Sequence, residues 1–332
     1  MGHKSRDGHG GDWDAYWQNA ASASAHKQGG PQDEVLERYW LGFFAEILPR
    51  LEIDSRMLDI ACGNGAVPGF ACGVLRDLGR VGDAAVYGLD GSPAALGEMR
   101  RRHPGIQGLA AHGASLPFRD NSLDLVSSQF GLEYAGADAV MEAARVVKPG
   151  GMFCAILHLH GGAIFQECEV NLKAINGVRA SRLLPCFEAL FHAALALQQG
   201  RADRDSFLAA DKSFAAAVAA VEDVFRHWGK TVADGMLLRL YTDVAHMYRR
   251  LKYYDQAEVF AWIGNMGREL DAYAGRMASM LEAALDESGL ERLTGQLTGE
   301  HFLIHRRETL NMGPQARPAA WVVVAEKITS HK

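Results

Sequence analysis

The sequence lacks the features that would place it in a membrane or in a secretory pathway. Its richest apolar stretch, residues 183–197, is interrupted by Pro185, Glu188 and His192. It falls short of the roughly 20 consecutive apolar residues that a membrane-spanning helix needs. The first residues also lack the apolar segment of a signal peptide. We therefore expect no membrane span and a cytoplasmic location.

Cysteine and positive charge are scarce as well. The five cysteines include no C-x-x-C pair, so free thiols are expected rather than a disulfide framework. The formal net charge is -6 at pH 7, whereas a protein that grips nucleic acid through its phosphates usually presents a basic face. Nucleic acid is therefore not an expected partner.

Strand-like and helix-like segments alternate over the first half of the chain. This rhythm is typical of an α/β protein with a doubly wound, mostly parallel sheet. We predict a Rossmann-like sheet whose terminal strand, near the end of the chain, is antiparallel. The predicted strands are residues 57–61, 85–90, 106–111, 123–127, 152–157, 291–296, 302–304 and 320–325.

A long helical block interrupts this pattern. After residue 162 the apolar residues recur at steps of three and four, as in Phe214, Val218, Val221 and Phe225, and this spacing favours amphipathic helices. We predict three parts: a flexible N-terminal segment (1–30), a Rossmann-like domain (31–162 and 289–332) and an all-helical insertion (163–288). The insertion is expected to form either a lid over the molecule that the protein acts on or a dimerisation element. A homodimer is therefore a possible assembly.

The strongest chemical signal is the strand that runs into a glycine turn at residues 58–65. Gly63 and Gly65 let the backbone adopt tight turns and approach a ligand closely. Asp59 places a carboxylate inside an otherwise apolar strand, which indicates a polar role. The next predicted strand ends in Asp90, where a carboxylate can accept hydrogen bonds from both hydroxyls of a ribose.

These motifs resemble a known family. D-x-A-C-G-x-G at 59–65, the strand ending in Asp90, L-P-F-x-D-x-S-x-D at 116–124 and V-K-P-G-G at 147–151 are similar to the motifs of class I S-adenosylmethionine-dependent methyltransferases. The branch that they resemble includes the ubiquinone and menaquinone C-methyltransferases. The resemblance covers about residues 40–160 and the last strand, and it implies S-adenosylmethionine as cofactor and S-adenosylhomocysteine as product.

The resemblance also implies roles for individual residues. Asp59 would orient the glycine loop near the methionine amino group, and Asp90 would hold the ribose. Ala114 and Ser115 would flank the adenine, although this chain has no acidic residue there to accept from the adenine amino group. The complete predicted cofactor set is Tyr16, Trp17, Asp59, Ala61, Gly63, Asn64, Gly65, Asp90, Gly91, Ser92, Ala114, Ser115, Gln129 and Phe130. Tyr16 and Trp17 would fold over the cofactor, or else simply pack on the surface.

The acceptor is expected at the carboxyl ends of the strands, where ligands of open parallel sheets bind. His158 and Tyr134 are the candidate catalytic residues there, as a general base is needed if the acceptor loses a proton. Both side chains could instead only shape the pocket. His158-x-His160 lacks an evident carboxylate partner, so no metal is predicted.

Several functions remain open at this point. The favoured one is methyl transfer to a small-molecule acceptor by in-line displacement. A non-catalytic cofactor-binding or scaffold protein and an enzyme using the same cofactor for other chemistry are alternatives. A NAD-dependent oxidoreductase would share the strand, turn and acid but usually has G-x-G-x-x-G, whereas Pro68 stands at the third position after Gly65.

Overall fold

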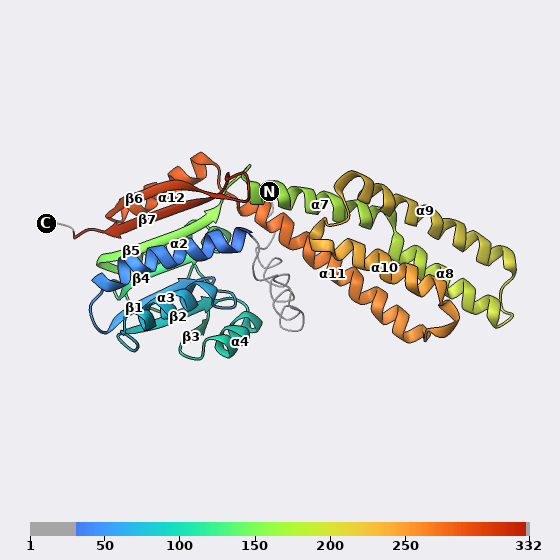
Figure 1. Ribbon diagram of the computed structural model, residues 1–332, viewed down its shortest axis with the longest axis horizontal. Helices are drawn as coiled ribbons and strands as arrows, with labels where there is room; N and C mark the ends of the chain where they lie inside the picture. The colour runs from blue at the N-terminus through green and yellow to red at the C-terminus, as the bar shows by residue number, and fades with distance from the viewer. Residues whose placement is uncertain (1–30, 330–332) are drawn as a thin grey trace. The chain divides into compact units, whose positions relative to one another are not determined.

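A computed structural model describes residues 31–329, which divide into two units (Figure 1). One unit combines the chain up to Gln166 with the chain from Ser279 onward, and the other is Glu167–Ala278. The predicted insertion, residues 163–288, extends somewhat beyond the second unit at both ends. Tyr16 and Trp17 lie outside the described residues.

The first unit is built on a seven-stranded sheet with the order β3-β2-β1-β4-β5-β7-β6. All pairs are parallel except those of β7, which is antiparallel to β5 and to β6. This arrangement confirms the predicted Rossmann-like sheet with its antiparallel terminal strand. The strands are β1 (Ser55–Ile60), β2 (Ala84–Asp90), β3 (Gln107–Ala110), β4 (Leu123–Gln129), β5 (Val147–His158), β6 (Phe302–Met312) and β7 (Arg317–Lys327).

Helices cover both faces of this sheet (Figure 1). Because successive strand residues point to opposite faces, Met57 packs in one apolar cluster and Leu58 in the other. The first cluster also contains side chains of α2 (Pro31–Ile47), α3 (Ala66–Asp77) and α4 (Pro93–Arg102). The second contains side chains of α5 (Leu132–Ala135), α6 (Ala137–Val146) and α12 (Glu287–Gly299). A short 3-10 helix, Leu48–Arg50, follows α2.

One predicted strand is wrong. Residues 291–296 belong to α12, whose buried leucines Leu290, Leu293 and Leu297 recur at helical spacing and pack in the second cluster. Asp286 begins this helix, because its side chain accepts a hydrogen bond from the backbone N–H of Gly289 at 2.7 Å. The N-cap and the three-to-four spacing of the leucines make this segment a helix.

The second unit is entirely helical among its described residues. Its helices are α7 (Ala163–Ser181), α8 (Leu183–Gln198), α9 (Arg204–Trp228), α10 (Met236–Arg249) and α11 (Gln256–Ala283), with 3-10 turns at Ala233–Gly235 and Leu251–Tyr253. They share one apolar core in which Phe214, Val221 and Phe225 are buried as their spacing predicts. The stretch Ala163–Gln198 has the length and composition of a membrane span. It consists of two helices, because α7 ends at Ser181 and α8 begins at Leu183.

Candidate functional site

The turn after β1 has backbone conformations that favour glycine. Gly63 and Gly65 have φ values of 53° and 83°, and Ala61 also lies in the left-handed region with a φ of 57°. A Cβ on Gly65 would lie 2.4 Å from Cγ of Met99, so close packing excludes a side chain as well. Asn64 is half-buried between the two glycines. The strand, turn and helix predicted from the sequence are all present.

Asp90 holds this turn in place. Its Oδ2 accepts a hydrogen bond from the backbone N–H of Gly63 at 2.8 Å, and its Oδ1 accepts one from Ser92 at 2.8 Å. Ser92 in turn caps α4 by accepting from the N–H of Ala95, with Gly91 exposed between the two. Each carboxylate oxygen has two lone pairs, so either can accept a second hydrogen bond. Asp90 can therefore bind a ligand and shape the turn at once.

Asp59 has a different environment from that of Asp90. It is buried in β1, and its Oδ1 accepts a hydrogen bond from the hydroxyl of Ser127 in β4 at 2.7 Å. Burial raises the pKa of Asp59 to about 8, and the nearby charge of Asp90 adds to this increase. The hydrogen bond to the glycine loop comes from Asp90, and the place of Asp59 near the loop and the methionine amino group stays a prediction.

The end of β4 meets the end of β1. Gln129 is fixed by Trp40 of α2, whose indole N–H donates to its Oε1 at 2.7 Å. Phe130 has a φ of 53° and donates its N–H to the carbonyl of Ile156 in β5 at 2.8 Å. A Cβ on the next residue, Gly131, would lie 2.2 Å from Cβ of Ala61. Gln129 and Phe130 thus lie at the end of β4 beside the glycine turn.

His158 ends β5 and is paired with Glu133, a residue that the sequence reasoning missed. Nδ1 of His158 lies 2.7 Å from Oε1 of Glu133, and the backbone N–H of His158 donates to the same oxygen at 2.9 Å. The ring contacts Phe130, with centroids 4.4 Å apart, and Tyr134 edge-on at 5.8 Å. The two predicted catalytic residues, His158 and Tyr134, are therefore in contact, and Glu133 binds His158.

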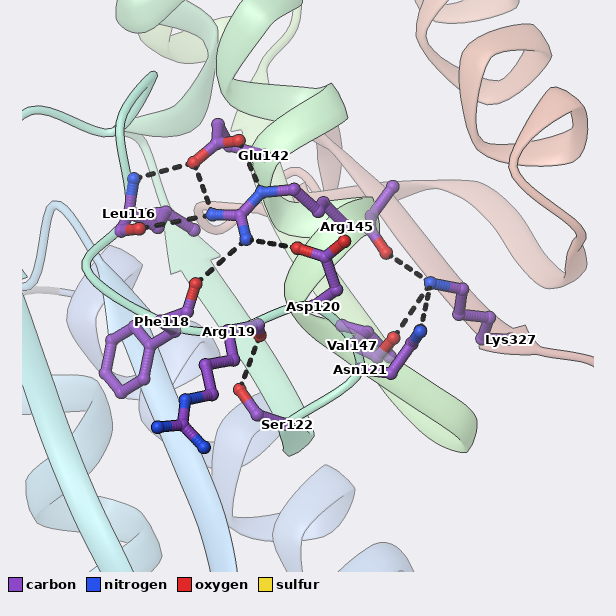
Figure 2. Close-up of polar contacts among 11 residues, drawn as sticks. Leu116, Phe118, Arg119, Asp120, Asn121, Ser122, Glu142, Arg145, Val147 and Lys327 are labelled. Carbon is purple, nitrogen blue, oxygen red and sulfur yellow. Dashed lines mark hydrogen bonds and ion pairs between the residues drawn. The ribbon is translucent and has the colours of Figure 1, made fainter.

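The predicted adenine-flanking loop is anchored by Arg145 of α6 (Figure 2). The guanidinium of Arg145 donates to the carbonyls of Leu116 and Phe118 and to Asp120, at 2.7 to 3.1 Å. Glu142 accepts from Arg145 and from the backbone N–H of Leu116. Arg145 and Glu142 thus form a clamp that holds the L-P-F-x-D segment in place. Half-buried Ala114 and exposed Ser115 lie just before this segment.

The residues on the far side of that loop are structural. Lys327 of β7 donates to Asn121 and to the carbonyls of Ala144 and Val147, which closes the same cluster in Figure 2. Asp124 accepts from the backbone N–H of Arg56 at 2.8 Å and pairs with Lys148. These contacts join β4 to its neighbours without facing the glycine turn.

Within residues 31–329, no group of three or more His, Cys, Asp or Glu side chains could hold a metal ion. His160 is exposed and contacts the ring of Phe165, whereas His158 is buried. The two histidines are therefore in different environments.

The comparisons with known proteins agree with this geometry. Residues 58–155 match the family described as a methyltransferase domain. The demethylmenaquinone methyltransferase of Chlorobaculum tepidum is 30% identical over 140 residues, covering 42% of this chain and 47% of that protein. The ubiquinone/menaquinone biosynthesis C-methyltransferase of Pseudomonas fluorescens is 33% identical over 122 residues, covering 35% and 46%. The chain thus spans about half the length of these curated relatives.

Solved structures are similar over part of the chain. A geranyl diphosphate C-methyltransferase from Streptomyces coelicolor is 18% identical with a TM-score of 0.34, covering 46% of this chain and 66% of that one. An S-adenosylmethionine-dependent methyltransferase from Mesorhizobium loti is 26% identical with a TM-score of 0.29, covering 36% and 55%. The family match and the curated relatives confirm the resemblance to the S-adenosylmethionine-dependent methyltransferases.

Proposed function

We propose that this chain, whose residues 58–155 form a methyltransferase domain, moves a methyl group from S-adenosylmethionine to a small-molecule acceptor. The observation that carries the proposal is the meeting of three elements at one edge of the sheet. These are the glycine turn, the carboxylate of Asp90 that holds it, and the ends of β4 and β5 with Phe130 and His158.

The residues at this edge fit the cofactor chemically. S-adenosylmethionine carries positive charge on its sulfonium and amino groups, and the carboxylate of Asp90 supplies negative charge beside the glycine turn. Asp90 would accept from the ribose hydroxyls, Ala114 and Ser115 would flank the adenine, and Gln129 and Phe130 would lie near the sulfonium. When bound, the cofactor supplies an electrophilic methyl group.

The task of the protein is then to hold the acceptor in line and close. Correct placement of two reactants accounts for a large share of the acceleration in such displacements. Trp40 fixes Gln129, and the bond from Phe130 to β5 fixes the strand ends, so the proposed pocket is preorganised. An acceptor that loses a proton would also need a base.

We also propose that the helical unit acts on the acceptor as a lid. Its two connections to the sheet run side by side at the end of β5. Leu285 donates its N–H to the carbonyl of His158 at 2.8 Å, and His160 donates to the carbonyl of Leu285 at 3.0 Å. The chain therefore leaves for α7 and returns from α11 beside the proposed catalytic histidine. Dimerisation is the alternative role, and the cytoplasmic location stays a prediction.

The acceptor classes to test first come from the relatives, which are named for menaquinone and ubiquinone precursors. The test incubates the full-length protein with S-adenosylmethionine and a set of reduced quinones, phenols and amines, and measures S-adenosylhomocysteine. Acceptor-dependent product formation is the expected result. Binding of NAD in place of S-adenosylhomocysteine would favour an oxidoreductase. Cofactor binding with no turnover of any acceptor would favour a non-catalytic binding protein.

The lid has its own measurement. Hydrogen exchange of α7–α11 is compared in the S-adenosylhomocysteine complex with and without an acceptor that is turned over. Slower exchange in the helical unit on adding the acceptor supports the lid. Unchanged exchange, together with a concentration-dependent dimer that protects these helices, would assign them to dimerisation.

A further inference from the structure

We propose that Glu133 is a positioning residue that makes His158 the general base, and that the acceptor loses a weakly acidic O–H or N–H proton to it. This inference rests on the proposed methyl transfer. Glu133 lies on α5, a helix of four residues directly after the end of β4. His158 is the last residue of β5, the neighbouring strand. The pair thus lies at the edge where the proposed methyl donor is held.

The contacts fix the histidine ring on several sides. Oε1 of Glu133 accepts from the backbone N–H of His158 and faces its Nδ1. The side chains are 0% exposed for Glu133 and 4% for His158. The rings of Phe130 and Tyr134 contact the imidazole. A ring held by a carboxylate and two aromatic neighbours has little freedom to rotate.

This geometry selects one tautomer of the neutral ring. A carboxylate only accepts hydrogen bonds, so the proton of the imidazole belongs on Nδ1 and the lone pair on Nε2. Nε2 has no hydrogen-bond partner among residues 31–329. A neutral histidine oriented in this way by a carboxylate is the arrangement used for general bases. Nε2 is therefore the atom that receives a proton.

The second oxygen of Glu133 indicates what kind of group arrives. Oε2 is buried and has no hydrogen-bond partner in the described part of the chain. Buried polar atoms are rarely left without one. The pair thus offers a lone pair on Nε2 and a further acceptor on Oε2, but no donor. A ligand that brings its own O–H or N–H complements it, whereas an aprotic ligand leaves both atoms unsatisfied.

The proton transfer balances within the acceptor and the histidine. The O–H or N–H bond of the acceptor breaks, its electron pair stays on the acceptor, and the proton binds Nε2. The imidazolium that forms is stabilised by the negative charge of Glu133 and later releases its proton to water. The freed electron pair makes the acceptor the nucleophile, either at that atom or at a carbon conjugated with it.

A second histidine–glutamate pair provides a matched control. His305 of β6 faces Glu326 of β7, with Nε2 and Oε2 2.9 Å apart, but these side chains are 39% and 40% exposed. The same exchange of carboxylate for amide can therefore be made at both pairs. Only the buried pair adjoins the proposed site.

The experiment uses the full-length protein, a set of phenols, enols and primary amines (which lose the proton of their ammonium form), and thioethers, which have no proton to lose. We expect turnover of protic members only, with phenols, enols and amines as separate arms that identify the group. Glu133→Gln should lower kcat about 100-fold, with KM and S-adenosylhomocysteine affinity within a few fold. Glu326→Gln should leave kcat unchanged.

A nitrogen NMR measurement tests the positioning directly. In the wild-type complex with S-adenosylhomocysteine, His158 should be the Nδ1-protonated tautomer, and Glu133→Gln should give a mixture. Equal kcat for Glu133→Gln and wild type, an Nε2-protonated tautomer, or turnover of aprotic acceptors would overturn the inference. So would binding of S-adenosylhomocysteine without turnover of any protic member. If Glu133→Gln does not fold, His158→Asn must lower kcat by about 1000-fold with a protic acceptor. Failure of the wild type to bind S-adenosylhomocysteine would instead reject the proposed function.

Discussion

The two halves of the site are built in different ways. At the ends of β1 and β2, Asp90 binds backbone N–H groups of Gly63 and Ser92, so its role depends on the loops that follow the two strands. At the ends of β4 and β5, Glu133 and His158 pair side chain to side chain across 25 residues of sequence. The proposed cofactor contacts thus lie in loop motifs, whereas the proposed proton chemistry depends on a tertiary contact.

His158→Asn should have the largest effect on kcat while leaving cofactor affinity unchanged, and so distinguish the two halves of the site. Asparagine keeps a polar side chain but removes the base, so kcat should fall about 1000-fold with a protic acceptor. Calorimetry should give the same affinity for S-adenosylhomocysteine as in the wild type, because the cofactor half is intact. A large loss of cofactor affinity would mean that the two halves are not separable.

The complementary change is Asp90→Ala. Hydrogen bonds to charged groups contribute about 1.5–3 kcal/mol each, and the substitution also removes the acceptor for Gly63 and Ser92. We expect cofactor affinity to fall by about ten- to a hundredfold with an unchanged circular dichroism spectrum. Unchanged affinity in calorimetry would show that Asp90 only shapes the turn.

Arg145→Ala tests whether the loop clamp supports the cofactor half. Several charge-assisted bonds to the 116–120 loop are lost (Figure 2), and we expect the free energy of unfolding to fall by about 2 kcal/mol. Urea unfolding measures this. Arg119→Ala is the control, because the Arg119 side chain has no contact drawn in Figure 2. Equal stability of the two variants would contradict the clamp.

Asp59→Asn should change the pH dependence of stability. The folded pKa of about 8 exceeds that of an unfolded aspartate, about 3.9, so the folded protein keeps a proton that the unfolded chain releases. The free energy of unfolding should therefore fall between about pH 4 and pH 8, by about 1.4 kcal/mol per pH unit at most. Asp59→Asn should remove this decline. Parallel urea-unfolding profiles for the two proteins would contradict it.

The sequence was sufficient for the features that depend on local spacing. The glycine turn, the strand ending in Asp90 and the last strand, β7, each have a short pattern of residue types that predicts them. Residues 291–296 were predicted wrongly as a strand because the cap at Asp286 was overlooked. Prediction from a short stretch of sequence therefore fails where a helix cap, rather than the periodicity of a few residues, determines the type of secondary structure.

Glu133 and the true partner of Asp59 could not be read from the sequence in the same way. Glu133 lies on a four-residue helix, and its partner His158 comes from another strand. One signal was available, since an acid directly after the end of β4 must lie near the end of β5 in a parallel sheet. The contact of Asp59 with Ser127 likewise depends on the register of β1 against β4.

Calorimetry with S-adenosylhomocysteine measures directly whether the glycine turn and Asp90 bind S-adenosylmethionine, as we propose. We expect saturable binding of one ligand per chain, competition by S-adenosylmethionine and a stabilisation of about 2.7 kcal/mol at 100 times the dissociation constant. The absence of binding by the wild-type protein at millimolar ligand, alongside binding of NAD, would contradict it.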